Sequence, residues 1–235
     1  MSGHTVENGD GGKLLTTPAL AIRVNRRARN ISLRVDPASG RVILTIPTER
    51  ARADGLRFAA RKTGWIERQL ATMSPRVPFR DGNVIPLRGR SRRIRHRPDI
   101  CGGVFETVDE ILVGGTVASL STTLREWLKA TAHAAIEERA REFLGRRGCD
   151  PVSIALRDPK SRWGSCSAKG TLSFSWRLVL APEMVLSYVV AHEVAHLEVF
   201  THGPRFWRKV AELEPDYATA EAWLRRHGNT LHRYG

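Results

Sequence analysis

The sequence has no long apolar run, no apolar segment near its start and few cysteines. A membrane-spanning helix needs roughly 18 consecutive apolar residues, so we do not expect an integral membrane protein. Residues 1–17 are polar and glycine-rich, which argues against a secretory signal. Cys101, Cys149 and Cys166 are too few for a disulfide scaffold and form no C-x-x-C pair. We therefore expect a cytoplasmic protein in a reducing environment.

Lysine is also scarce, because 32 of the 38 basic residues are arginine. The basic residues outnumber the 24 acidic ones, which leaves a net charge of +14 on the 235-residue chain. A strong positive field favours nucleic acid, nucleotides or other polyanions as partners. The same excess is also compatible with a solvated surface, so these partners are hypotheses that charge alone does not decide.

The chain divides into three predicted regions. Residues 1–17 form a tail that we expect to be disordered, residues 18–116 form a β-rich basic N-terminal region, and residues 117–235 form a compact C-terminal domain. Within the N-terminal region, alternating apolar residues on both sides of a turn predict a β-hairpin over 30–47. Apolar residues at three- and four-residue intervals then predict an amphipathic helix over 56–73.

Short strands are predicted over 83–115, and they enclose the densest basic run of the chain, at 88–97. As an edge strand, this run would use its charges to prevent edge pairing. As a functional patch, it would hold phosphate groups. The sequence leaves both interpretations open.

The C-terminal region begins with a long apolar stripe that predicts a helix over 117–144. A short strand around 152–156 and a second hairpin over 163–176 follow. Pro182 then opens a helix that is apolar nearly all round, which predicts a buried helix. Two shorter helices complete the predicted α+β fold, at 204–213 and 217–226.

The buried helix carries the motif H-E-x-x-H, formed by His192, Glu193 and His196. Two histidines four residues apart leave the same face of a helix, so both can bind one ion. Glu193 lies one step round the helix, where it can reach a water molecule bound to that ion. Leaving these polar groups unpaired inside an apolar run would cost several kcal/mol, which argues against a chance occurrence.

A third histidine, His202, follows at a spacing that suits the same ion. Gly203 and Pro204 interrupt the helix, so the chain can bend His202 back towards His196. Three neutral imidazoles with an open fourth position are typical of catalytic zinc. Glu193 would act as the general base that takes a proton from zinc-bound water. Candidate hydrogen-bond partners of the ligands are three carboxylates among which the sequence does not choose: Glu198, Glu212 and Glu214.

The polar run 160–167 is predicted to border the metal site as an edge strand that pairs with an extended substrate. A hairpin with a packed tryptophan is the alternative. Lys160 and Arg162 would stabilise an oxyanion or bind an anionic group, and Ser165 would bind substrate beside them. Cys166 has no assignable base beside it, so we interpret it as a structural thiol.

Three segments of the sequence carry a resemblance to a known family. They are KSRWGSCS at 160–167, YVVAHEVAHL at 188–197 and HGPRFW at 202–207. Together they resemble the YgjP-like metallopeptidase-domain family, which is related to the SprT-like and WLM zinc proteases. A looser resemblance extends over the N-terminal hairpin and helix, so that it covers about residues 20 to 230.

This resemblance implies a compact, gluzincin-type, zincin-like domain over 117–235 in a bacterial cytoplasmic protein. It implies zinc ligands at His192, His196 and His202 and a general base at Glu193. Metzincins share the spacing of the third ligand, but Val199 stands where they have glycine, so we do not place the chain among them. One member of the YgjP-like family is described as a pyrophosphatase that acts on uridine triphosphate.

Three functional hypotheses follow. The first is a zinc metallopeptidase that hydrolyses peptide bonds in a protein or peptide substrate. The second is a nucleoside triphosphate pyrophosphohydrolase, in which the run 88–97, or Lys160 and Arg162, would bind phosphates. The third is a DNA-associated protease like the SprT-like relatives, which the net charge of +14 favours. We expect no membrane partner.

Overall fold

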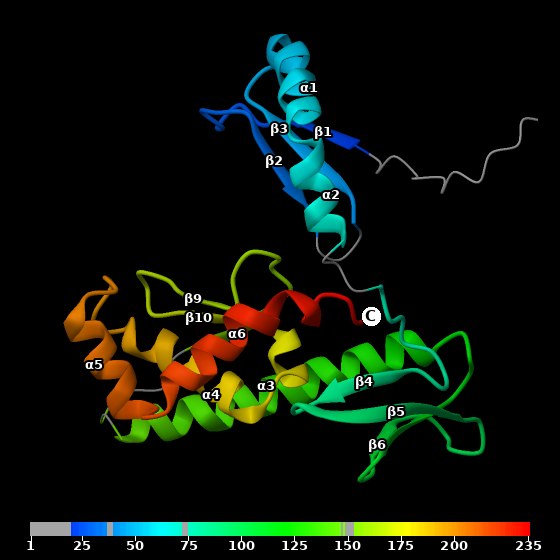
Figure 1. The fold of residues 1–235 in the computed structure, drawn as a ribbon. Coiled ribbons are helices and arrows are strands. Elements are labelled where there is room, and N and C mark those ends of the chain that lie inside the picture. Colours follow the sequence, from blue (N-terminus) through cyan, green and yellow to red (C-terminus); the bar gives the residue numbers. More distant parts are fainter. Residues whose placement is uncertain (1–19, 37–39, 72–74, 147, 149–152) are drawn as a thin grey trace, which may run out of the picture. The chain divides into compact units, whose positions relative to one another are not determined.

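The computed structural model describes residues 20–36, 40–71, 75–146, 148 and 153–235 (Figure 1). The tail predicted at 1–17 lies outside the described residues. The fold mixes strands and helices, which confirms the α+β prediction. The described residues form two compact units, one within 20–71 and the other within 75–235. None of the described helices is both long and apolar enough to cross a membrane.

The N-terminal unit contains a three-stranded sheet of β1 (Leu20–Val24), β2 (Ser32–Val35) and β3 (Val42–Ile46) in the order β1-β3-β2. β2 and β3 pair antiparallel, which confirms the predicted hairpin. β1 pairs parallel with β3 and is a strand that the sequence analysis does not predict. Val42, Leu44 and Ile46 are buried on one face of β3, as their alternation requires.

Two helices pack on this sheet where the sequence predicts one. The helix expected over 56–73 is observed as α1 (Arg52–Arg61) and α2 (Thr63–Ala71), preceded by the 3-10 turn η1 (Glu49–Ala51). The break falls at Lys62, whose backbone leaves the helical region at ψ 11°. A Cβ atom on Gly55 would lie 2.8 Å from the Ile46 side chain, so glycine permits the close approach of α1 to β3.

The second unit begins with a four-stranded sheet in the order β4-β5-β7-β6. Its strands are β4 (Val84–Leu87), β5 (Arg90–Arg97), β6 (Val104–Glu106) and β7 (Glu110–Gly114). Most of the basic run 88–97 thus forms the interior strand β5, so the edge-strand interpretation is wrong. The physical reason is that Ile94 enters the core while arginines on the other face meet solvent, which leaves both backbone edges free to pair. Arg95 also pairs with Glu110 of β7, at 2.8 Å.

This sheet shares its apolar core with the long helix α3 (Leu120–Arg146), which also contacts α4 and η2 (Figure 1). Residues 75–116 therefore pack with the C-terminal elements, whereas the sequence analysis groups them with the N-terminal region. The reason is the apolar face of the sheet, which the helix covers. Core residues that sheet and helix contribute are Ile85, Leu87, Ile94, Ile111, Leu124 and Leu128.

A second three-stranded sheet contacts the helix that carries H-E-x-x-H. It consists of β8 (Ile154–Arg157), β9 (Gly164–Cys166) and β10 (Leu172–Ser175) in the order β8-β10-β9, so β9 is an edge strand as predicted. β9 pairs antiparallel with β10, which confirms the second hairpin, and β8 pairs parallel with β10. Gly164 and Cys166 share the face of the core residues Phe174 and Leu172, and Ser165 lies on the opposite face.

Four helical segments complete the second unit. They are η2 (Trp176–Leu180), α4 (Glu183–Ala195), α5 (Pro204–Leu213) and α6 (Tyr217–Leu231). α4 contacts α3, α5, α6 and β9, and most of its residues are buried. These surroundings explain why its sequence is apolar nearly all round. α6 continues past the end predicted at 226.

Candidate active site

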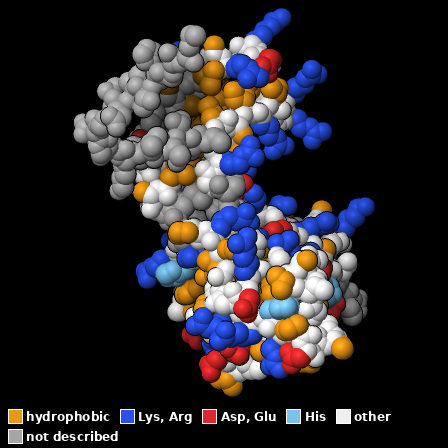
Figure 2. Space-filling model, turned by 90° about the vertical axis from the view of Figure 1, so that its right-hand side faces the viewer, with side chains coloured by type: hydrophobic (Ala, Val, Ile, Leu, Met, Phe, Trp, Pro, Cys, Tyr) orange, Lys and Arg blue, Asp and Glu red, His pale blue; other side chains and the backbone are white. Residues whose placement is uncertain are grey.

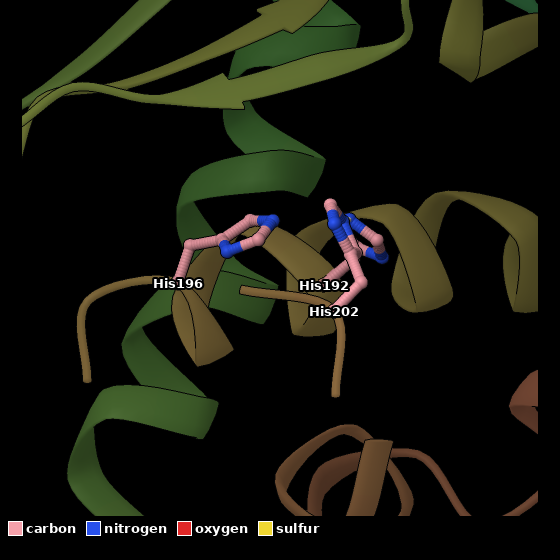
Figure 3. A group of neighbouring side chains, drawn as sticks. All are labelled: His192, His196 and His202. Atoms are coloured by element: carbon pink, nitrogen blue, oxygen red, sulfur yellow. The ribbon is translucent and has the colours of Figure 1, made fainter. Parts of the chain in front are cut away.

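Three histidine side chains meet at the C-terminal end of α4 (Figure 3). His192 lies in the last turn of α4, His196 caps the helix, and His202 belongs to the loop before α5. One nitrogen from each ring lies within 4.8 Å of the other two, and the Nε2 atoms of His192 and His202 are 3.1 Å apart. The fold therefore brings the three expected ligands close enough for one ion to contact them after small side-chain rotations.

The chain reverses direction directly after α4. A hydrogen bond of the i to i+3 type, from Leu197 N to Val194 O at 3.1 Å, tightens the end of the helix. Gly203 then takes an extended backbone conformation, and Pro204 begins α5. This bend returns His202 to the end of α4, as the glycine–proline pair predicts.

A backbone carbonyl orients one of the histidine rings. In the tautomer with a proton on Nδ1, His196 donates a hydrogen bond to Val199 O at 3.0 Å. That tautomer leaves the Nε2 lone pair of His196 for a metal ion. A carbonyl in this position fixes the ring as second partners of metal ligands commonly do.

The three carboxylates considered as partners of the ligands make other contacts. Lys209 Nζ lies 3.6 Å from Glu198 and 3.4 Å from Glu212. Ser187 Oγ donates a hydrogen bond to Glu214. For His196, the partner is thus the carbonyl of its own loop, a contact that side-chain chemistry alone does not indicate in a sequence.

Burial lowers the pKa of two of the three clustered imidazoles. It lowers the pKa of His192 to about 4, and the nearby rings of His196 and His202 add to the shift because charged imidazoles repel one another. Burial also lowers the pKa of His196. The buried Nδ1 atom of His192 has no hydrogen-bond partner among the described residues. Neutral rings with unused lone pairs are the form in which histidine binds a metal ion.

Aromatic side chains of α5 pack against the three histidines. The ring centroid of Phe206 lies 4.8 Å from that of His192, 4.5 Å from that of His196 and 4.8 Å from that of His202. Trp207 adds a contact with His192 at 5.9 Å. Through these contacts Phe206 and Trp207 pack on the H-E-x-x-H helix and shield one side of the site from water.

Glu193 is buried against the edge strand β9, and 5% of its surface is exposed. A Cβ atom on Gly164 would lie 2.5 Å from Glu193 Oε1, so the strand backbone and the carboxylate are in direct contact. Burial raises the pKa of Glu193 to about 7, and the positive charge of Arg162 opposes that shift. A carboxylate with a pKa in this range suits a general base at neutral pH.

Gly164 is a site residue that the sequence analysis misses. The sequence places it inside the polar run 160–167, where nothing local shows that the backbone must approach a carboxylate. The one available signal is the glycine itself, because glycine within a strand often marks the close approach of another group.

The other residues of 160–167 take different positions around this contact. Arg162 is exposed and near enough to Glu193 to act on its charge, and Lys160 is exposed in the preceding loop. Ser165 lies on the sheet face away from Gly164, so its side chain points away from Glu193. Cys166 is half-buried, and burial raises the pKa of its thiol, which favours the unreactive protonated form.

A histidine outside the cluster is also buried. His232 is 4% exposed and stacks on Trp163, with ring centroids 5.1 Å apart. Gly228 of α6 makes room for the same indole, since a Cβ atom there would lie 3.2 Å from it. His232 reaches this position because α6 extends beyond its predicted end and carries the segment against Trp163.

Comparisons with known proteins identify a family, and the similar solved structures include two metallopeptidase zymogens. The family model described as YgjP-like, metallopeptidase domain, matches residues 29–227. No curated protein matches the chain. The metallopeptidase zymogen abylysin of Pyrococcus abyssi is 27% identical, with a TM-score of 0.34, over 41% of this chain and 92% of its own. The metallopeptidase zymogen jannalysin of Methanocaldococcus jannaschii is 21% identical, with a TM-score of 0.35, over 39% of this chain and 88% of its own.

The family match covers most of the chain, including residues from both compact units. The three segments that carry the resemblance all lie within the matched residues: 160–167, 188–197 and 202–207. The match also contains Glu193 and the three clustered histidines. The chain therefore belongs to the YgjP-like metallopeptidase-domain family.

Proposed function

We propose that this chain is a zinc-dependent metallopeptidase that hydrolyses peptide bonds in a protein or peptide substrate. The observation that carries the proposal is the convergence of His192, His196 and His202 beside the buried carboxylate of Glu193. Membership of the family supports the same chemistry at the level of a metallopeptidase domain.

The donor set fits zinc. The clustered donors are imidazole nitrogens, which suit Zn²⁺, whereas Mg²⁺ and Ca²⁺ prefer oxygen. Low pKa values keep the rings of His192 and His196 neutral, and the hydrogen bond to Val199 holds one of them in place. When bound, zinc would supply Lewis acidity and lower the pKa of a water molecule to about 7.

Glu193 is proposed to move the proton. Its carboxylate would accept a proton from the attacking water and then deliver it to the nitrogen of the leaving amine. The backbone of β9 packs directly against this carboxylate. A pKa of about 7 allows the same group to accept and release a proton at neutral pH.

The edge strand β9 is proposed to hold the substrate backbone. Because β9 pairs with β10 on one side, the backbone groups of its other side can pair with an extended peptide. Such a peptide would run past Glu193, since Gly164 of β9 touches that carboxylate. Arg162 and Lys160 would bind an anionic group or the developing oxyanion, and the backbone of Ser165 would pair with the peptide.

Elemental analysis together with a peptide-cleavage assay tests the proposal. The wild type is expected to hold about one zinc per chain. Glu193→Gln should keep zinc but lose at least about 10²-fold in turnover, because an amide cannot accept the proton. His196→Ala should lose zinc, and Glu138→Gln, on an exposed position of α3, should behave as wild type. Full activity of Glu193→Gln, or a wild type that takes up no zinc, would contradict the proposal.

The same assay separates the peptidase from the nucleoside triphosphate alternative. Uridine triphosphate and peptides are offered to the wild type and to Glu193→Gln in parallel. If the wild type hydrolyses the triphosphate and leaves the peptides intact, the substrate is the nucleotide and not a peptide. The proposal also includes a cytoplasmic setting, which the free thiols of Cys101 and Cys166 fit.

Association with nucleic acid is a second candidate function, and the charge of the N-terminal unit favours it. Residues 20–71 contain twelve Lys and Arg against four Asp and Glu, a net charge of +8. Lys and Arg side chains project from this unit in Figure 2. In this case the peptidase would act on proteins bound to nucleic acid, and phosphate contacts would make its binding depend on salt.

A further inference from the structure

A cavity of about 530 Å³ lies over the β8-β10-β9 sheet, and its lining includes Arg157, Arg162, Ser165 and Ser173. We call it the arginine cavity. We propose that the arginine cavity binds an acidic side chain of the peptide substrate. This inference rests on the peptidase function proposed above and deepens it by naming a substrate preference.

Strand alternation places the polar residues of this lining on one face of the sheet. Ser165 of β9 pairs with Ser173 of β10. Arg157 of β8 follows Leu156, whose side chain packs against the core, so Arg157 is on the same face as Ser173. Gly164 is one residue away from Ser165 and therefore belongs to the opposite face, where it meets Glu193.

The arginine cavity carries positive charge that no described carboxylate neutralises by an ion pair. Arg157 and Arg162 are exposed, and within the described part of the chain the guanidinium group of neither residue forms an ion pair or a hydrogen bond. Asp158 is the acidic residue of the lining, and both of its oxygens bind Arg177, at 2.7 and 3.2 Å. Since Arg177 already offsets Asp158, the guanidinium groups of Arg157 and Arg162 are left to bind an anion.

The arginine cavity reaches the proposed reaction centre through β9. Gly164 contributes to its lining and also touches Glu193. A peptide paired with β9 would advance about 3.3 Å per residue, and its side chains would alternate between the two faces of the sheet. A side chain one or two residues from the scissile bond would therefore face the arginine cavity.

A carboxylate matches this lining better than a polyphosphate. The planar guanidinium group presents paired donors in the geometry of a carboxylate, and the hydroxyls of Ser165 and Ser173 add further donors. A nucleoside triphosphate would bring more negative charges than the two guanidinium groups of Arg157 and Arg162 can offset. The side chain of Asp or Glu is the chemistry that fits.

Peptides that differ only by Glu or Gln test this preference. Each position around the cleaved bond is occupied in turn by Glu or Gln, and kcat/KM is measured for zinc-loaded wild type, Arg157→Gln and Arg225→Gln. At one position the wild type should favour Glu by about ten-fold or more, as a charge-assisted hydrogen bond implies. Arg157→Gln should bring that ratio close to one. Arg225→Gln, on an exposed position of α6, should retain it.

Binding is measured separately on the Glu193→Gln background, so that this result does not depend on turnover. Fluorescence polarisation of labelled peptides should show the same preference for Glu, and adding Arg157→Gln should remove it. Equal affinity for the Glu and Gln peptides at every position would overturn the inference, even if the wild type cleaves both. If the Glu peptide binds in a way that depends on Arg157 but the wild type does not cleave it, the result would support the inference and contradict the proposed peptidase function.

Discussion

Gly164 allows the backbone of β9 to touch Glu193 because it has no side chain. A Cβ atom there would lie 2.5 Å from Oε1 and 2.6 Å from Cγ of that residue, so Gly164→Ala must displace the carboxylate or the strand. We expect kcat/KM for a peptide to fall by about 10²-fold, the effect of misplacing a catalytic group by roughly 1 Å. Elemental analysis should find wild-type zinc, since Phe206 still packs against the three histidine rings.

The matched control for this substitution is Gly145→Ala in α3. No heavy atom lies within 4 Å of a Cβ atom built at Gly145, and alanine favours a helix more than glycine does. This variant should keep wild-type kcat/KM and gain slightly in stability. Wild-type activity of Gly164→Ala would show that the reaction does not need Glu193 in its observed position.

The burial of Glu193 also makes the stability of the metal-free protein depend on pH. The pKa of this carboxyl group rises from 4.5 to about 7, so the folded state binds the proton more tightly than the unfolded chain. The stabilisation of the folded state by the proton on Glu193 is fully present below the unfolded pKa. It is lost as the pH rises to about 7 and stays absent above that pH. The loss is on the order of 3 kcal/mol.

Glu193→Gln should remove this dependence, because an amide does not ionise. With a chelator present, we expect the Tm of Glu193→Gln to exceed that of the wild type at about pH 8, and the difference to vanish near about pH 4. Glu138→Gln should follow the wild type at both pH values. A constant difference in Tm between wild type and Glu193→Gln would contradict a buried, proton-binding Glu193.

At the scale of elements, Arg177 of η2 fastens the end of α6 to the segment before β9. Its guanidinium group binds Asp158 and donates to Leu231 O at 3.2 Å and Tyr234 O at 2.6 Å. It also lies 4.5 Å from the ring centroid of Trp176. Arg177→Met should lower the free energy of unfolding by about 2–3 kcal/mol, less than for a fully buried pair because Asp158 is 49% exposed.

Urea unfolding followed by circular dichroism measures this loss. Arg225→Met provides the control, since Arg225 is 76% exposed and forms an i,i+4 pair with Glu221 on the surface of α6. We expect it to change the free energy of unfolding by less than about 0.5 kcal/mol. Equal midpoints for the two variants would mean that Arg177 does not anchor α6.

Elements that depend on a local pattern could be predicted from the sequence. Both hairpins and α3 are found as expected, because their patterns involve residues that are near one another in the chain. These patterns are the alternation in 30–47 and 163–176 and the helical periodicity in 117–144. The parallel pairs β1–β3 and β8–β10 join segments without a common turn, and nothing local indicates them. Charge in the run 88–97 indicates exposed side chains and carries no information on the pairing of the backbone edges, so the sequence does not distinguish an edge strand from an interior one.

The candidate site divides in the same way. The convergence of the three histidines could be predicted because it depends on local spacing. His192 and His196 lie on one helix, and His202 follows in the bend directly after it. The contact of Gly164 with Glu193 and the outward direction of Ser165 depend on how β9 packs on α4. Packing between segments leaves no periodic trace in a single sequence.

At the scale of the whole molecule, positive charge is concentrated in the N-terminal unit, with +8 of the total +14 in residues 20–71. Binding to duplex DNA through this unit should weaken linearly with the logarithm of salt concentration. A variant with four arginines of this unit changed to Gln should bind DNA more weakly; they are Arg23, Arg26, Arg27 and Arg29. The slope of log affinity against log salt concentration should fall by up to about one for each of these arginines that contacts a phosphate. Fluorescence polarisation of labelled DNA at several salt concentrations measures both quantities.

The control for this variant removes the same charge from the second unit. It replaces four exposed arginines of that unit by Gln, namely Arg141, Arg208, Arg225 and Arg226. An equal loss of affinity in both variants would assign DNA binding to net charge and not to the N-terminal unit. Absence of binding by the wild type at low salt would remove nucleic acid from the candidate partners.

The three histidines all lie within residues 192–202, so an ion held by them closes only a short loop. An unfolded chain keeps such neighbours together and retains part of the affinity, which limits how much an ion can favour the folded state. The core of the second unit also draws on α3 and the four-stranded sheet, far along the chain from this loop. A chelator should thus abolish the proposed peptidase activity while the protein stays folded. Adding zinc back should restore activity without a refolding step. Metal supply would then turn activity on and off reversibly in a protein that stays folded throughout.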